Sequence, residues 1–241
     1  MKTVVIGDLH GSDIWKGIIY KEEPNKVIFL GDYFDSFTYS ANTQWHNFIN
    51  ILSFKDDHPE IEVILLVGNH DHHYLKYVGN SGTSGYNKAW SLQFGEVLMK
   101  ADLKMAYQQD NILFSHAGIS HVFLSKYYPN YDVTKVADYI NELFYHKPLV
   151  FKFNTQASDP YGDDVFQSPI WIREKSLMLA NKNTELKETY IQVYGHTVTN
   201  KIDTKGHHTG GKYYCIDTLN TSKEYMYIED SQIKFNKWSS T

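Results

Sequence analysis

Six side chains that could bind a metal ion follow short apolar runs along the sequence. They comprise two aspartates, one asparagine and three histidines, namely Asp8, His10, Asp32, Asn69, His116 and His196. This mixture of carboxylate, amide and imidazole donors suits hard or borderline divalent ions such as manganese, iron or zinc. Six donors are too many for one tetrahedral zinc ion and suit two ions that share a carboxylate. Two such ions can clamp the attacking and departing oxygens of a phosphoryl transfer.

These donors lie in or at the ends of segments that read as β-strands. Each segment begins with a run rich in Val, Ile, Leu or Phe, as in strands that are covered on both faces. The five segments are 3–11, 26–37, 62–71, 111–118 and 189–197. Ligands of α/β folds bind beyond the carboxyl ends of such strands. The strand ends are therefore the expected position of a site.

Between these strands lie segments with helical content, so the sequence predicts an α/β architecture. The expected helices lie within 12–23, 40–55, 88–100, 132–146 and 174–188. Three short strands are expected near the end of the chain, at 212–218, 224–230 and 231–238, with antiparallel pairing. They predict a mixed sheet or two sheets. The polar, turn-rich segment 153–169 is expected to form a long loop.

The composition is that of an ordinary globular protein. The chain has 241 residues, 42% of them hydrophobic, and a net charge of −5. This charge does not favour an extended nucleic-acid-binding surface. No apolar run approaches the ~20 residues needed to span a bilayer. Cys215 is the single cysteine, so no intrachain disulfide can form. We expect one domain over residues 1–241, in the cytoplasm.

The motifs "GDLHG", "GDYFDS", "GNHD", "SHAG" and "GHT" occur in this order within residues 7–197. Together they closely resemble the motifs of the calcineurin-like metallophosphoesterases. Within that superfamily they look most like the branch of phosphoprotein phosphatases and bacterial diadenosine tetraphosphatases. The resemblance implies a four-layered αββα sandwich with two mixed β-sheets. It also implies two divalent metal ions, with manganese as the first choice and iron or zinc as alternatives.

The same resemblance implies roles for single residues. Asp8 and His10 would bind the first metal ion, and Asp32 would bridge the two ions. Asn69, His116 and His196 would bind the second ion. His70 would be the general acid, oriented by Asp35. A carboxylate bonded to one ring nitrogen fixes the tautomer and raises the pKa of the imidazole, which suits that role.

Two residues bear on how a phosphate would be held. Arg173, in "SPIWIRE", resembles an arginine that contacts the phosphate in bacterial members, and Asn69 is the second residue expected to contact the substrate. Arg173 is the single Arg among 23 basic residues. A planar guanidinium suits phosphate better than a lysine ammonium does. Ser36 departs from the pattern, because the phosphatase branch usually has an Arg there that grips the phosphate.

We therefore expect a metal-dependent phosphatase that hydrolyses phosphomonoesters, of a phosphoprotein or a small phosphorylated metabolite, by attack of a metal-bridging hydroxide. The alternative is a phosphodiesterase or pyrophosphohydrolase acting on nucleotides such as diadenosine polyphosphates or cyclic nucleotides. Ser36 gives this alternative weight, because losing the Arg weakens dianion binding. A third hypothesis is a metal-bound scaffold without catalysis. Such proteins usually lack metal ligands or the catalytic histidine, and this chain keeps both.

Several polar residues near the motifs are expected to have ordinary roles. His72 and His73 are predicted at the surface at a helix start, and Asp71 is predicted to support the turn. Asp217 is expected to be structural.

Overall fold

The computed structural model describes residues 1–79, 85–154, 163–204, 206 and 209–239. This part of the chain contains ten strands: β1 (Lys2–Ile6), β2 (Lys26–Phe29), β3 (Glu62–Leu66), β4 (Leu103–Lys104), β5 (Ala106–Gln109), β6 (Ile112–Ser115), β7 (Ile191–Tyr194), β8 (Tyr213–Cys215), β9 (Glu224–Glu229) and β10 (Gln232–Lys237). Its α-helices are α1 (Trp15–Glu22), α2 (Ala41–Asp57), α3 (Asn69–His72), α4 (Ser91–Lys100), α5 (His121–Tyr127), α6 (Val136–His146), α7 (Glu174–Ala180) and α8 (Glu185–Thr189). Two 3₁₀-helices lie at Val133–Lys135 and Pro148–Phe151.

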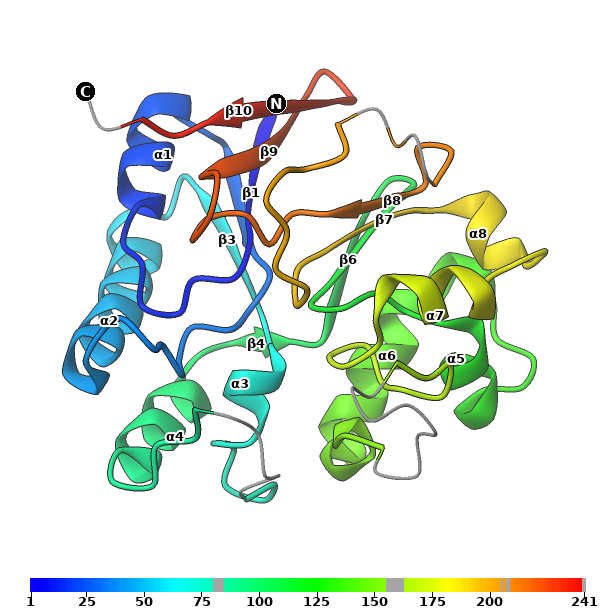
Figure 1. Cartoon of the computed structure of the whole chain (residues 1–241), viewed down its shortest axis with the longest axis horizontal. Coiled ribbons are helices and arrows are strands. Elements are labelled where there is room, and N and C mark those ends of the chain that lie inside the picture. Colours follow the sequence, from blue (N-terminus) through cyan, green and yellow to red (C-terminus); the bar gives the residue numbers. More distant parts are fainter. Residues whose placement is uncertain (80–84, 155–162, 205, 207–208, 240–241) are drawn as a thin grey trace.

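The strands form two mixed sheets that lie between two layers of helices. The larger sheet has the order β10-β9-β1-β2-β3-β4, and the smaller has the order β5-β6-β7-β8. In each sheet, parallel pairs are joined to at least one antiparallel pair. Figure 1 shows α1, α2 and α4 beside the larger sheet and α5 to α8 beside the smaller one. The predicted αββα sandwich with two mixed sheets is confirmed.

The alternation of side chains along the strands explains these layers. In β1, Val4 and Ile6 belong to the core shared with α1 and α2, whereas Val5 belongs to the core between the sheets. In β2, Phe29 belongs to the core shared with the helices, and Ile28 belongs to the core between the sheets. Successive residues of a strand point to opposite faces, so a strand covered on both faces must be apolar throughout. The continuous apolar runs of the sequence have this cause.

Some predicted elements differ from the observed ones. The helix expected over 174–188 is two helices, because Asn181 ends the first and the Thr184 side chain caps the second. The segment 212–218 contributes β8, which pairs in parallel with β7 rather than antiparallel with its successors. Antiparallel pairing holds for β9 and β10. Helix α5 was not predicted; it begins after Ser120, whose hydroxyl accepts from the Phe123 N–H.

The segment 153–169 has neither helix nor strand in its described parts, 153–154 and 163–169, and its remainder lies outside the described residues. Among the described helices, none has the length and apolar character that crossing a membrane would need.

Candidate active site

The loops that leave β1, β2, β3, β6 and β7 meet at one edge of the sandwich. Four of the predicted site residues on these loops have left-handed backbone, with φ of 45° at His10, 53° at Asp32, 63° at Asp35 and 67° at His196. Side-chain-bearing residues seldom adopt this conformation, and it clusters at functional sites. The loops also approach closely: a Cβ on Gly195 would overlap the carboxylate of Asp8. Glycine at this position is therefore required by the carboxylate.

The structure brings the six predicted metal donors together. The Asn69 amide oxygen lies 2.9 Å from His116 Nε2 and 2.9 Å from His196 Nδ1. Asp32 Oδ2 lies 3.4 Å from His116 Nε2 and 3.7 Å from His10 Nε2, so one carboxylate oxygen faces imidazoles on two sides. Asp8 accepts the backbone N–H of His196 at 3.0 Å. Ligand atoms of Asp8, Asp32 and His116 all lie within 4.8 Å of one another.

Each of the three donor histidines has its other ring nitrogen bound to a backbone carbonyl. Nδ1 of His10 donates to the Phe34 carbonyl at 2.7 Å, and Nδ1 of His116 donates to the Leu30 carbonyl at 3.0 Å. Nε2 of His196 donates to a carbonyl at 3.2 Å. A carbonyl can only accept, so these contacts fix the tautomer and leave one lone pair per ring pointing into the cluster.

These lone pairs are the evidence that the cluster suits a cation. The free nitrogens of neutral His116 and His196 face the Asn69 amide oxygen, and all three atoms are acceptors. Acceptors cannot satisfy one another, whereas a divalent cation between them would bind all three. Bound carbonyl partners that orient a ligating imidazole are typical of metal sites. The donor set therefore fits divalent metal ions, in agreement with the candidate metal-binding cluster of Asp8, Asp32 and His116 among the described residues.

The pKa shifts of the residues in the cluster also favour a metal site. Burial lowers the pKa of His116 and lowers the pKa of His196 well below its usual value, although the charge of Asp32 opposes both shifts. Both imidazoles are therefore neutral and able to bind a metal ion. Burial and the charges of Asp217 and Asp32 raise the pKa of Asp8 well above its usual value. Two buried carboxylates at close quarters need a nearby positive charge if both are to ionise.

His70 and Asp35 form a pair beside the cluster. His70 Nδ1 donates to Asp35 Oδ2 at 2.9 Å, and the carboxylate is fully buried. Burial alone would lower the pKa of His70, but the charge of Asp32 and the hydrogen bond to Asp35 raise it to about 9. Burial opposes ionisation of Asp35, yet hydrogen bonds from His70 and His73 lower the pKa of its carboxyl. The pair is held as imidazolium and carboxylate.

Asp71 joins the loops that follow β2 and β3. Its carboxylate accepts the backbone N–H of Asp32 at 2.7 Å, of Tyr33 at 2.9 Å and of Gly68 at 2.9 Å. In the other direction, Asp32 Oδ1 accepts the backbone N–H of His70 at 2.9 Å. The two loops that carry Asp32 and Asn69 are thus locked together, as the turn-supporting prediction for Asp71 required.

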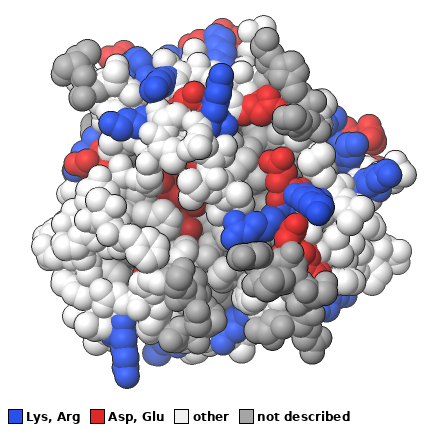
Figure 2. Space-filling model, in the orientation of Figure 1, with Lys and Arg blue, Asp and Glu red and all other residues white. Residues whose placement is uncertain are grey.

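A cavity of about 730 Å³ opens over the cluster. Figure 2 shows it as a hollow near the middle of this face, with acidic side chains at its floor. His70 and Arg173 line it, together with Asp217. The Arg173 guanidinium donates to Thr197 Oγ1 at 3.0 Å and to the His196 carbonyl at 3.4 Å, which fixes it at the cavity wall.

Ser36 lines the cavity and forms a turn. Its hydroxyl accepts the backbone N–H groups of Thr38 at 3.1 Å and Tyr39 at 3.0 Å, forming a tight turn. This turn places Phe37, 86% exposed, at the cavity mouth. The aromatic side chains of Phe37 and Tyr39 therefore lie at the cavity.

One prediction about neighbouring residues was wrong. His72 and His73 are 2% and 1% exposed rather than at the surface, because α3 packs inside the fold. Asp217 lines the cavity, and burial and the charge of Asp32 raise the pKa of its carboxyl to about 7; its structural role stays a prediction. His70 and His73 are three residues apart, a spacing that places two side chains on one face of a helix. This spacing was the sequence signal that could have placed His73 near His70.

Comparisons with known proteins agree with this geometry. A model of the calcineurin-like phosphoesterase family matches residues 1–221. No curated protein has a significant sequence match to the chain. The chain is similar in structure to a cold-active protein-tyrosine phosphatase of a psychrophilic Shewanella species, with 17% identity, a TM-score of 0.59, and coverage of 97% of this chain and 77% of that chain. It is also similar to a metallophosphoesterase from Sphaerobacter thermophilus, with 11% identity, a TM-score of 0.51, and coverage of 100% and 90%. At these identities the likeness concerns the fold.

Proposed function

Because the chain belongs to the calcineurin-like phosphoesterase family and is thus a phosphoesterase hydrolase, we propose that it hydrolyses phosphomonoesters with two divalent metal ions, manganese being the first choice. The substrate class would be a phosphoprotein or a small phosphorylated metabolite. The observation that supports this proposal most is the contact of three neutral acceptors, His116, His196 and Asn69, beside the carboxylate of Asp32.

In this proposal, Asp8 and His10 hold the first ion and Asp32 bridges to the second. Asn69, His116 and His196 complete the set for the second ion. When bound, the two ions supply an activated water and neutralise charge on the phosphoryl oxygens. The carbonyl contacts of the imidazoles keep their lone pairs directed at the ions, so little reorganisation is needed on binding.

His70 would give its proton to the departing oxygen of the ester. Its Nδ1 is held by Asp35, so Nε2 is the nitrogen that would donate in the cavity. A pKa raised to about 9 keeps His70 protonated at neutral pH, although bound cations would lower it by charge repulsion. The Arg173 guanidinium, fixed by Thr197, would contact the phosphoryl oxygens.

The runner-up is hydrolysis of a phosphodiester or phosphoanhydride, such as a diadenosine polyphosphate or a cyclic nucleotide. Two observations favour it: Ser36 leaves one phosphate clamp unfilled, and the cavity of about 730 Å³ is larger than a phosphate group needs. A monoester carries a dianion and depends more on such clamps than a diester does.

The test combines elemental analysis of the purified protein with a panel of phosphate esters. We expect about two manganese ions per chain and faster hydrolysis of p-nitrophenyl phosphate than of bis(p-nitrophenyl) phosphate. The reverse order of rates would favour the runner-up. Asp32→Asn should lose metal and activity together. If the wild-type protein binds metal yet hydrolyses no ester in the panel, it is a scaffold and the proposal is wrong.

A further inference from the structure

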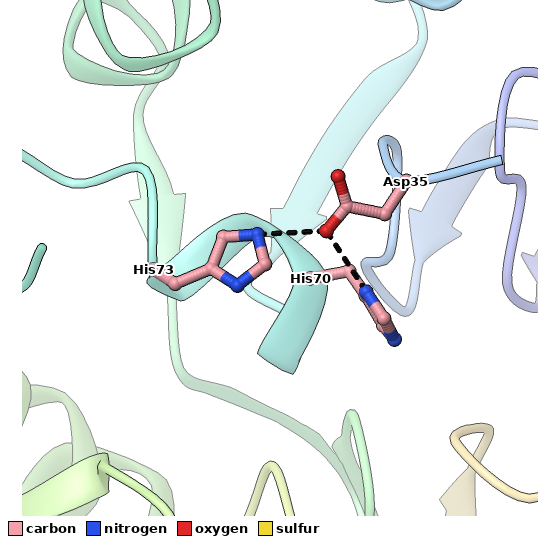
Figure 3. Close-up of side chains that lie close together, drawn as sticks. All are labelled: Asp35, His70 and His73. Carbon is pink, nitrogen blue, oxygen red and sulfur yellow. Dashed lines mark hydrogen bonds and ion pairs between the residues drawn. The ribbon is translucent and has the colours of Figure 1, made fainter. Parts of the chain in front are cut away.

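The Asp35 carboxylate has more partners than a simple histidine–aspartate pair. Besides His70, the Nε2 atom of His73 lies 2.7 Å from Oδ2, and the Tyr74 hydroxyl donates to Oδ1. Figure 3 shows Asp35 between the two imidazoles, with both contacts ending on the same oxygen. The Tyr74 oxygen in turn accepts the backbone N–H of Asn87 at 2.7 Å.

His73 is well placed to hold this carboxylate. Its side chain is fully buried, and Asp35 is the one polar contact of its ring among the described residues. The ring packs edge-on against Tyr74, with centroids 4.3 Å apart, and against Tyr86, with centroids 5.0 Å apart. A buried imidazole so confined has little rotational freedom, so the position of its Nε2 is fixed.

The spacing of the three groups argues against a metal site. Asp35, His70 and His73 could in principle hold an ion. Ligand atoms around a tetrahedral ion with bonds of ~2.0–2.1 Å lie about 3.3 Å apart. Here Oδ2 lies 2.7 Å from His73 Nε2 and 2.9 Å from His70 Nδ1, and both distances are shorter than that separation. The His70 contact is a hydrogen bond, and the His73 contact is an ion-pair contact without hydrogen-bond geometry.

We propose that His73 is a positioning residue for His70: it holds the Asp35 carboxylate from the side opposite His70 and thereby fixes the direction in which His70 Nε2 points. The inference rests on the proposed function, in which His70 protonates the departing oxygen. With Tyr74 on one oxygen and two imidazoles on the other, the carboxylate cannot rotate. Figure 3 shows the second ring nitrogen of His70 pointing away from Asp35, and His70 lines the cavity.

The activity test uses the dependence of kcat on the leaving group in the manganese-loaded protein. A proton donor matters most for poor leaving groups and least for good ones. His73→Ala should therefore lower kcat on the order of 10-fold for an alkyl phosphate, with KM nearly constant, and by much less for p-nitrophenyl phosphate. His73→Gln, whose amide can donate to Oδ2, should restore most of the loss. An equal loss for all leaving groups would overturn the proposal.

His72→Ala is the matched control. His72 is also a buried imidazole of the same short segment, but its Nε2 donates to the Pro148 carbonyl at 2.9 Å, and among the described residues Asp35 is not one of its partners. It should leave the leaving-group dependence unchanged. In a His70→Ala background, His73→Ala should cause no further loss of kcat, because the two residues act through one step. A further loss of 10-fold would show an independent role and contradict the proposal.

A second readout does not need activity. In metal-free protein, the His70 Nδ1 proton bound to Asp35 should exchange slowly with water and give a downfield proton resonance, assigned by its absence in His70→Ala. His73→Ala should speed its exchange, whereas His73→Gln and His72→Ala should not. If His73→Ala is poorly folded, His73→Phe keeps the packing against the tyrosines and removes the donor. An unchanged resonance in both removal variants would overturn the proposal, even if no ester were hydrolysed.

Discussion

At the scale of single residues, the histidines of the site are held in two different ways. His10, His116 and His196 each donate to a backbone carbonyl, which fixes the ring orientation; burial keeps His116 and His196 neutral by lowering their pKa, so each has one lone pair free. His70 donates instead to the carboxylate of Asp35, which stabilises the charged ring. The partner of the second ring nitrogen thus distinguishes an imidazole suited to bind a metal ion from one suited to carry a proton.

Removing His70 should separate chemistry from metal binding. His70→Ala is expected to lower kcat by ~10²–10⁴, the range that a general acid contributes. Metal content should stay near that of the wild type, because the six donors are untouched. Turnover assays and elemental analysis of the same preparation check both halves. Full turnover in the variant would remove His70 from the mechanism.

Replacing Arg173 by Lys should weaken substrate binding more than metal binding. The guanidinium is fixed by Thr197 and can still offer paired donors to a phosphate, whereas an ammonium is a point charge. The loss of one charge-assisted hydrogen bond, worth about 1.5 kcal/mol, corresponds to a KM about 10-fold higher. Steady-state kinetics with parallel metal analysis test this. An unchanged KM would show that the phosphate is gripped elsewhere.

At the scale of elements, the site depends on how the strand ends are tied together. Asp71 on α3 accepts three backbone N–H groups, from Asp32, Tyr33 and Gly68. It connects the loop that carries Asp32 with the loop that carries Asn69. The site therefore lies in the loops that follow the strands, and hydrogen bonds between these loops hold its side chains in place.

Asp71→Ala should remove the three hydrogen bonds by which Asp71 holds the loops after β2 and β3. Each buried N–H left without an acceptor costs about 1–3 kcal/mol, so the free energy of unfolding should fall by at least about 2 kcal/mol. Manganese affinity should fall as well, because Asp32 loses its fixed backbone. Chemical denaturation and calorimetric titration measure the two effects. A variant with wild-type stability and affinity would show that the two loops are held together by other contacts.

The strand ends were predictable from the sequence, and the packing around them was not. Apolar runs that stop at Gly or Ser and a polar donor indicate the candidate metal donors, because the strand period and the residues at a strand's end are local properties of the sequence. The burial of His73 depends on α3 lying under the site, which no local pattern encodes. The pairing of β8 with β7 depends on contacts between segments about twenty residues apart. The position of Asp217 in the cavity could not be predicted either, because Asp217 lies just after β8 and its place depends on where β8 pairs.

At the scale of the whole molecule, the titratable groups of the site determine how the free energy of unfolding depends on pH. In the metal-free protein, His70 has a pKa of about 9, raised by Asp32 and Asp35 against the effect of burial. In the unfolded chain it would titrate near pH 6.5. Its stabilising contribution is therefore complete below pH 6.5 and is lost as the pH rises toward 9. Cys215, whose pKa burial raises to about 12, acts in the same direction above pH 8.5.

The free energy of unfolding of the metal-free protein should thus fall between pH 6.5 and pH 9. His116 and His196 have lowered pKa values and are neutral in both states above about pH 7.5, so they offset the loss only near pH 6.5. Urea denaturation in the presence of a chelator, at both pH values, measures the change. His70→Ala should show a smaller decrease. A stability that is constant or rises over this interval would contradict the charge arrangement described.

The central claim is that donors from five strand ends surround two cations that share Asp32. Anomalous diffraction from a crystal soaked in manganese tests it most directly. The predicted result is two anomalous peaks ~3.5–4 Å apart, one on each side of the Asp32 carboxylate, with Asn69 and His116 at the second. A single peak, or no peak within bonding distance of Asp32, would contradict it.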